Sequence, residues 1–443
     1  MAQAKGQQIS PMKLQAMLIY CLANVGMMVL DTLLDQYTMF FYAPKKSGAE
    51  AVGHAAIQLA PIALVGLALN FGRVVDAIAN PLVGFWSDRT KTKWGRRIPY
   101  VLFGSIPMTA FFILLYSPPI HHLSNWNAVW FGVMCGGFLF LYTLTVAPYL
   151  ALIPEIAQTS DDRVKLSSWH ALASMLGLII GAVVSGAMIK PFGIRGMAIS
   201  MALFSLATIL ITALSVKEKP IQESKVARLS FKDAIIPTLK NKHFIIYAFS
   251  ISSFWLGYKV IQSSTIYICT VILKKPEGYV SMIMAGMLAV LLLTLPFVFW
   301  LYGRIGKKKL FMTGLVLIML FSPLQFFVQK VGVFMSPVIF FHIIVAIMGV
   351  PIALMMVIYN AVISDIIDYD EKQTGMRREA MYYGMEGFFT KIARGVGASL
   401  SAFLFAIFGL EAGKVGGLLL AGPFCAFFAL MGVIIFSKYK LSD

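Results

Sequence analysis

Twelve long apolar stretches decide what this chain can fold into. Each is long enough to cross the hydrocarbon core of a bilayer, which takes about 20 residues in a helix. A backbone inside that core finds no water, and runs of this length satisfy their polar groups as helices. We therefore predict an all-α membrane protein with twelve transmembrane helices at 14–43, 55–86, 98–117, 127–154, 166–189, 195–216, 243–273, 279–302, 310–329, 335–363, 381–408 and 415–437.

The charge of the chain agrees with a membrane protein and argues against a nucleic acid partner. Charged residues make up 13% of the 443 residues, against about 25% in soluble domains. The net charge of +17 gathers in alternate loops, such as SDRTKTKWGRR (87–97) and GRIGKKK (303–309), which is typical of cytoplasmic loops. We expect an integral plasma membrane protein in a lipid bilayer, with both termini cytoplasmic. The short loops and the lack of an Asn-x-Ser/Thr site favour a bacterial inner membrane.

The chain repeats itself in two halves. The second and eighth stretches are each followed by a basic loop, and the fourth and tenth by an acidic one, ALIPEIAQTSDDRVK and AVISDIIDYDEKQTG. The longest connection, 217–242, separates six stretches from six. We predict an N-terminal six-helix bundle over 1–216, a cytoplasmic linker over 217–242 and a C-terminal six-helix bundle over 243–443. Transporters built from two such repeats bind substrate between them at the bilayer midplane.

Ionisable side chains interrupt several of these stretches. They are costly inside a bilayer, so each is a candidate functional residue. The candidates are Asp31, Asp35, Arg73, Asp76, His170, Lys259, Glu386, Lys391 and Arg394.

Helical spacing groups some of these residues on shared faces. Arg73, Asp76 and Asn80 follow the pattern i, i+3, i+7, so they share one face of the second helix. Arg73 can pair with Asp76 on that helix. Lys391 can pair across the halves, with Asp76 or with an aspartate of the first helix.

For each residue, a structural ion pair is the alternative to a functional role. Function is favoured for Asp76 and Lys391, because a buried carboxyl can be neutralised by a proton or a bound cation. Asp35 is expected near the outer mouth, as a gate or as a solvated residue. Arg394 is interpreted as lying near the outer end of its helix, with its head group reaching the interface.

Motifs for energy coupling by ATP and for catalysis do not occur in the sequence. There is no GxxxxGK[ST] phosphate loop, and no HExxH or GxSxG motif. The four cysteines lie in apolar stretches and are interpreted as buried thiols. We expect a protein that is not an enzyme and has no resident cofactor, its only ion being a co-transported H⁺ or Na⁺.

Two segments carry a family resemblance. DAIANPLVGFWSDRTKTKWGRRIPY (76–100) and ISDIIDYDEKQTGMRREAMYYGMEGFFTKIARGVGASL (363–400) resemble the two signatures of the glycoside–pentoside–hexuronide:cation symporters, a branch of the major facilitator superfamily. The resemblance covers essentially the whole chain and implies an alternating-access symporter. It implies a cation site at Asp76, Asn80 and Thr143, which Lys391 links to the substrate site. It also implies a gating loop containing Asp88, Arg89, Arg96 and Arg97.

The chain also departs from this family. Asn80 replaces a second carboxylate, and Met28 and Val146 stand where sugar-binding aspartates are expected. A single carboxylate is enough for a proton, so proton coupling is favoured over sodium. The identity of the substrate does not carry over from the family.

The substrate cavity is expected to be rich in cations, with Arg73, Lys259, Lys391 and His170. We expect the site to contain Asp31, Asp35, Arg73, Tyr149, His170, Trp255, Lys259, Gln262, Glu386 and Lys391. Such a site suits a sugar-like small organic solute, and an anionic one in particular. A lysolipid or amphiphile carrier, a non-sugar organic anion transporter and a non-transporting receptor are the alternatives. A monomer is expected.

Overall fold

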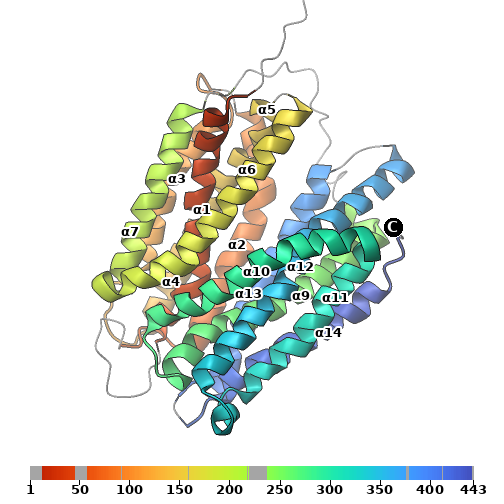
Figure 1. Ribbon diagram of the computed structural model, residues 1–443. Coiled ribbons are helices and arrows are strands. Elements are labelled where there is room, and N and C mark those ends of the chain that lie inside the picture. The colour runs from red at the N-terminus through yellow and green to blue at the C-terminus, as the bar shows by residue number, and fades with distance from the viewer. Residues whose placement is uncertain are drawn as a thin grey trace, which may run out of the picture.

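Long helices joined by short turns make up the computed structural model (Figure 1), which describes residues 12–44, 57–90, 92–157, 159–216, 218, 237–375, 379–411 and 413–441. The first half holds α1 (Leu14–Tyr42), α2 (Ile62–Arg89), α3 (Ile98–Leu115), α4 (Asn125–Ala151), the short α5 (Ile153–Ile156), α6 (Ser160–Ile179), the π-helical η1 (Ile180–Val184) and α7 (Ser185–Ser215). The second half holds α9 (Lys242–Tyr267), η3 (Ile268–Ile272), η4 (Glu277–Tyr279), α10 (Val280–Ile305), α11 (Lys307–Phe321), η5 (Ser322–Phe327), η6 (Lys330–Val333), α12 (Pro337–Thr374), α13 (Glu379–Phe408) and α14 (Gly416–Ser437).

The described residues contain eleven helical segments that are long and apolar enough to cross a membrane. One of them, Lys165–Ser215, has 51 residues. A straight helix of that length would measure about 76 Å, more than twice the thickness of the hydrocarbon core. The backbone leaves the helical region at Gly193 (φ 67°, ψ 173°), where glycine bears no steric cost. This turn lies between the predicted stretches 166–189 and 195–216, so the segment accounts for two of the twelve expected passes.

Polar caps explain where several helices begin. Ser124 accepts a hydrogen bond from the backbone N–H of Trp126 at the start of α4. Asn241 accepts from the first backbone N–H groups of α9 in the same way. These caps satisfy N–H groups that have no partner inside the helix. Each of these residues therefore fixes where its helix begins, a boundary that hydropathy alone predicts only to within a few residues.

The helix α12 is longer than its apolar stretch. The sequence predicts an end at residue 363, but the helix continues to Thr374. Its last turns carry the acidic sequence SDIIDYDEKQT, which ends the hydrophobic signal without breaking the helix. Gly375 closes it in the left-handed conformation (φ 68°), and its N–H donates to the carbonyl of Glu371 at 2.8 Å.

The helices form two groups that meet along α2 and α13. Figure 1 shows α1 to α7, coloured red to lime, beside α9 to α14, coloured green to blue. At the meeting line the backbones approach closely: a Cβ added at Gly395 would lie 2.6 Å from Oδ1 of Asn70, and one at Gly66 2.3 Å from Cβ of Ala402. Small residues permit such packing between membrane helices. Ser399 adds a hydrogen bond, with its hydroxyl 3.0 Å from the carbonyl of Gly66.

The two groups also meet near the C-terminal end of α1. The hydroxyl of Tyr267 on α9 donates to the carbonyls of Met39 (3.2 Å) and Ala43 (3.0 Å). The hydroxyls of Tyr37 on α1 and Ser281 on α10 are 3.1 Å apart. These bonds fasten the two groups together at one end of the helices.

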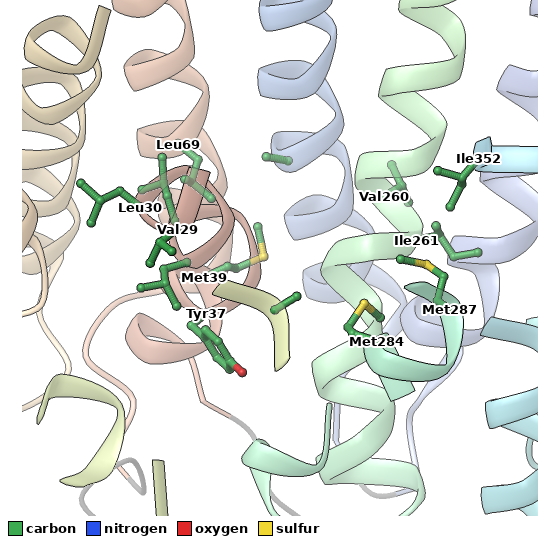
Figure 2. Packing of buried hydrophobic residues seen from close by; sticks show 14 of the residues in the cluster. Val29, Leu30, Tyr37, Met39, Leu69, Val260, Ile261, Met284, Met287 and Ile352 are labelled. Atoms are coloured by element: carbon green, nitrogen blue, oxygen red, sulfur yellow. The ribbon is translucent and has the colours of Figure 1, made fainter. Parts of the chain in front are cut away.

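Apolar packing fills both groups. Figure 2 shows Val29 and Leu30 of α1 on one side and Val260 and Ile261 of α9 on the other, all buried. The four cysteines are free and buried among these apolar residues, as the sequence predicted.

Candidate functional site

Asp35 of α1 binds cationic side chains from three other helices. Its Oδ1 accepts hydrogen bonds from Nη2 of Arg73 on α2 (2.8 Å) and from Nζ of Lys259 on α9 (2.9 Å). Its Oδ2 accepts from Arg394 on α13. The Asp35 side chain is only 5% exposed, so the expectation of a solvated residue is wrong, and its role as a gate stays a prediction.

Asp31 lies one helical turn before Asp35 and shares two of these cations. Its two oxygens are 3.3 Å from Nη2 of Arg73 and 3.4 Å from Nη2 of Arg394. The side chain of Asp31 is 19% exposed and that of Arg394 is 22% exposed. This edge of the cluster is therefore more open than the Asp35 side.

Asp76 forms a second centre on α2. Its Oδ1 accepts hydrogen bonds from Nζ of Lys391 (2.8 Å) and from the hydroxyl of Thr143 on α4. The Lys391 ammonium also lies 3.3 Å from the Thr143 oxygen. The predicted pairing of Lys391 with Asp76 is thus present, and it joins the two halves of the chain.

The side-chain amide of Asn80 donates a hydrogen bond within its own helix. Its Nδ2 donates to the backbone carbonyl of Asp76 at 3.3 Å, within the same helix. The family resemblance implies a carboxylate at this position. In this chain an amide stands there instead, and it binds the backbone carbonyl of Asp76.

Arg73 connects the two centres. Its Nη2 bonds Asp31 and Asp35, while its Nη1 is 3.7 Å from Oδ2 of Asp76. The cluster holds four cations, Arg73, Lys259, Lys391 and Arg394, against three aspartates. Transferring such charges out of water costs several kcal/mol for each ion, and only mutual pairing offsets that cost. When all seven are ionised, these four cations and three aspartates carry one positive charge in excess, with Glu386 not counted.

Aromatic and amide groups of α9 extend the cluster. The guanidinium of Arg394 lies 5.6 Å from the ring centroid of Trp255, a distance at which a cation is attracted to the ring face. The ammonium of Lys259 is 3.5 Å from Oε1 of Gln262. These side chains of α9 therefore lie beside the ion pairs.

Two other predicted residues lie in a separate cluster. Tyr149 is fully buried and its ring stacks on Tyr20 at 4.5 Å, while the His170 ring is 5.9 Å from Tyr149. Each tyrosine hydroxyl donates to the backbone carbonyl of the other tyrosine, at 2.7 and 3.0 Å. This arrangement joins α1, α4 and α6 within the first half.

Glu386 lies on α13, five residues before Lys391, and is half-buried. In the described part of the chain it makes no hydrogen bond or ion pair. Its carboxyl remains a candidate for substrate binding.

The loop after α2 contains the predicted gating residues. Asp88 and Arg89 end α2, and their side chains lie outside the described part of the chain. Nε of Arg96 is 3.8 Å from the carboxylate of Glu218, which also accepts from the backbone N–H of Arg97 at 2.9 Å. Glu218 follows α7, so this loop is tied to the segment that leads toward the second half.

The interpretation of Arg394 from the sequence was wrong. Its guanidinium turns inward to Asp35 and Asp31 instead of reaching the outer interface. The available signal was its position one turn after Lys391, on the same helical face. The partners, more than 350 residues earlier in the chain, gave no local signal.

Comparison with known proteins adds independent information. A family model described as MFS/sugar transport protein matches residues 19–443. The chain is 24% identical to the isoprimeverose transporter of Lactiplantibacillus pentosus, over 87% of this chain and 78% of that protein. It is 24% identical to the glucuronide carrier protein homolog of Escherichia coli, over 80% of this chain and 77% of that protein. It is also 24% identical to the sodium-dependent lysophosphatidylcholine symporter 1 of Gallus gallus, over 78% and 71%.

A solved structure shows the same fold. The crystal structure of the nucleoside transporter NupG superimposes with a TM-score of 0.66 and 16% identity, covering 97% of this chain and 100% of that one. At this identity the likeness concerns the fold alone.

Proposed function

This chain belongs to the MFS/sugar transport protein family, and we propose that it carries a sugar-like organic anion across the membrane together with a proton. The family and the fold are those of membrane transporters, not of enzymes. The coupling ion and the substrate are our inference from the charged cluster.

The pair formed by Asp76 and Lys391 carries the proposal. The carboxylate belongs to the first half and the ammonium to the second, and they are 2.8 Å apart beside the Thr143 hydroxyl. A proton on Asp76 would remove the charge that holds Lys391, so the two halves could then move relative to each other. This links occupancy of one carboxyl to alternating access.

A proton fits the surroundings of Asp76 better than sodium does. Hard metal cations take several oxygen ligands. Among the described residues, the hydroxyl of Thr143 is the side-chain oxygen that hydrogen-bonds Asp76. The Asn80 amide is turned to its own backbone. A single titrating carboxyl needs no further ligand.

The excess of cations supports an anionic substrate. Arginine and lysine bind carboxylates through short charge-assisted hydrogen bonds. Lys259 and Arg394 offer such donors beside the Trp255 ring, which can pack against the apolar face of a sugar. The similarity to a glucuronide carrier homolog agrees with this choice.

We place both termini and the basic loops in the cytoplasm of a bacterial inner membrane, on the positive-inside rule. The bundles 1–216 and 243–443 would then rock about the interface of α2 and α13, with the substrate between them and 217–242 as the linker. In this orientation the contacts of Tyr267 with Met39 and Ala43 lie on the outer side. A monomer contains both halves of the proposed site.

A lysolipid or amphiphile carrier is the second candidate. It is favoured by the similarity to the lysophosphatidylcholine symporter of Gallus gallus. The same cations would then bind a phosphate-bearing head group.

A thermal-shift experiment on the purified protein tests the proposal. Glucuronate, glucose and lysophosphatidylcholine are compared at two pH values, with sodium or choline as the cation. A ligand that binds the folded state stabilises it by RT ln(1 + [L]/Kd), so the thermal midpoint rises with the ratio of ligand concentration to Kd. We expect stabilisation by glucuronate but not glucose, equal in sodium and in choline. Stabilisation by the lysolipid, or a strict need for sodium, would contradict the proposal.

A further inference from the structure

We propose that Asp35 is a built-in substitute for the acid group of the substrate. In the substrate-free protein it binds the side chains that an anionic substrate takes over, and the substrate enters by displacing it. The inference rests on the anionic substrate of the proposed function.

The partners of Asp35 divide between the two halves. Arg73 lies in the same half as Asp35, whereas Lys259 and Arg394 lie in the other half. Both oxygens of Asp35 are in use, and the carboxylate is buried. It therefore places two oxygens where the carboxylate of an acidic sugar would have to bind.

These cations need a partner when no substrate is bound. Leaving a buried charge unpaired strongly destabilises a protein. A carrier that presents its cations to an incoming anion must therefore neutralise them in the empty state. The carboxylate of Asp35 neutralises these cations in the empty state, and the carboxylate of the substrate can replace it because the two groups are chemically alike.

The other ion pairs allow Asp35 to be displaced. Arg73 keeps Asp31 and Asp76 as partners, and it can also retain Asp35 itself. Lys259 differs, because Asp35 is its carboxylate partner among the described residues. When Asp35 yields, Lys259 is the cation that is left to the substrate. Arg394 also loses Asp35, but it keeps Asp31 as a partner.

This exchange has a mechanical consequence. The pairs of Asp35 with Lys259 and Arg394 hold α1 to α9 and α13 across the halves. A substrate carboxylate that takes these two cations breaks both pairs. Substrate binding would thus replace two ion pairs between the halves with contacts to the substrate, which can dissociate.

Two other roles for Asp35 predict different behaviour. If Asp35 bound hydroxyl groups of the substrate, its removal would weaken every ligand. If it were only a structural ion, acetate could still fill its place in D35A, but the removal of Asp35 would not tighten the binding of glucuronate.

Chemical rescue separates these cases. Asp35→Ala leaves Lys259 and Arg394 beside an empty volume that a small carboxylate can enter. We expect acetate to raise the thermal midpoint of D35A by several degrees, and acetamide, which has the same shape but no charge, to leave it unchanged. Asp31→Ala is the matched control, because Asp31 is one turn away and does not contact Lys259, so acetate should have little effect on it. We also expect D35A to bind glucuronate at least tenfold more tightly than the wild type does.

The outcomes distinguish this inference from the function on which it rests. Weaker glucuronate binding by D35A, or equal rescue of D35A and D31A by acetate, would overturn the role of Asp35. If acetate rescues D35A but the wild type binds no acidic sugar, the anion site at Lys259 and Arg394 would be supported and the proposed substrate would be rejected. If D35A is recovered from membranes only in acetate buffer, its glucuronate affinity is measured in competition with acetate: tighter binding than that of the wild type supports the inference, and weaker binding overturns it. If D35A is recovered in neither acetate nor acetamide, the double variant of D35A with Lys259→Met is tested. Stable folding of this double variant with no response to acetate would support the proposed role of Asp35. Failure of the double variant to fold would overturn it.

Discussion

Nζ of Lys391 lies 2.8 Å from Oδ1 of Asp76, although 315 residues separate them in the chain. The pair joins α13 to α2 along the line where the two groups of helices are most closely packed. The Asp76 side chain is 1% exposed and the Lys391 side chain is 23% exposed, so the lysine is the more accessible member of the pair.

Replacing Asp76 with Asn should abolish uphill transport. The amide has the shape of the acid but neither binds a proton nor attracts Lys391 as a carboxylate does. We expect proteoliposomes with this variant to lose accumulation driven by a pH gradient while retaining exchange of substrate. Asn80→Ala on the same face is the control and should accumulate substrate normally, because its amide binds its own backbone. Accumulation by D76N at the wild-type level would place coupling elsewhere.

Removing one partner of this pair should destabilise the protein more than removing both. Lys391→Met alone leaves Asp76 without its shortest cationic contact, and a broken buried pair costs about 3–5 kcal/mol. Lys391→Met combined with Asp76→Asn leaves no unpaired charge, and its thermal midpoint should recover most of the loss. A double-mutant cycle of midpoints measures the coupling. If the losses in thermal midpoint of the two single variants simply add in the double variant, Lys391 and Asp76 contribute to stability independently.

Replacing Arg394 with Lys should weaken the binding of anions. A planar guanidinium bonds Asp31 and Asp35 together and faces Trp255, which a single ammonium on a flexible stem does not reproduce. We expect glucuronate affinity to fall by about tenfold or more, or 1.4 kcal/mol, in isothermal titration. Arg304→Lys is the control, because Arg304 stacks on the exposed Trp300 outside the cluster. An unchanged affinity of R394K would exclude Arg394 from the anion site.

Adding a methyl group at Gly395 should disrupt the meeting of α2 and α13. The new Cβ would lie 2.6 Å from Oδ1 of Asn70 and 3.0 Å from Cβ of Arg73, and overpacking of this kind costs about 1–3 kcal/mol. Gly387→Ala on the same helix is the control, since a Cβ there meets nothing within 4 Å. We expect a lower thermal midpoint and slower transport for G395A only. Equal behaviour of the two variants would show that the helices can separate without loss.

Replacing Glu218 with Gln should loosen the loop between α2 and α3. The carboxylate accepts from the backbone N–H groups of Arg97 (2.9 Å) and Ile98 (3.3 Å), at the start of α3. An amide oxygen accepts these bonds more weakly and loses the attraction to Arg96. We expect faster cleavage by trypsin after Arg96 in inside-out vesicles. Unchanged cleavage would show that other contacts hold the loop.

The sequence predicted the membrane helices and the faces that carry charge well, because hydrophobicity and helical spacing are local properties. It predicted the pairing of Lys391 with Asp76 as one of two possibilities, since spacing cannot choose between partners on different helices. It failed for Arg394, whose inward direction depends on how α13 is rotated against α1 and α2. It grouped Tyr149 with the charged residues, whereas stacking on Tyr20 holds it in a separate cluster.

The amino-acid order by itself determined that this chain spans a membrane as helices, that its halves repeat, and that a few costly charges lie within the spans. These follow from the absence of water in the bilayer, which acts on each segment separately. Only the tertiary structure decided that Asp35 binds Arg73, Lys259 and Arg394 at once. Buried charges are stable only within a few ångströms of their partners, and the packing of four helices sets those distances.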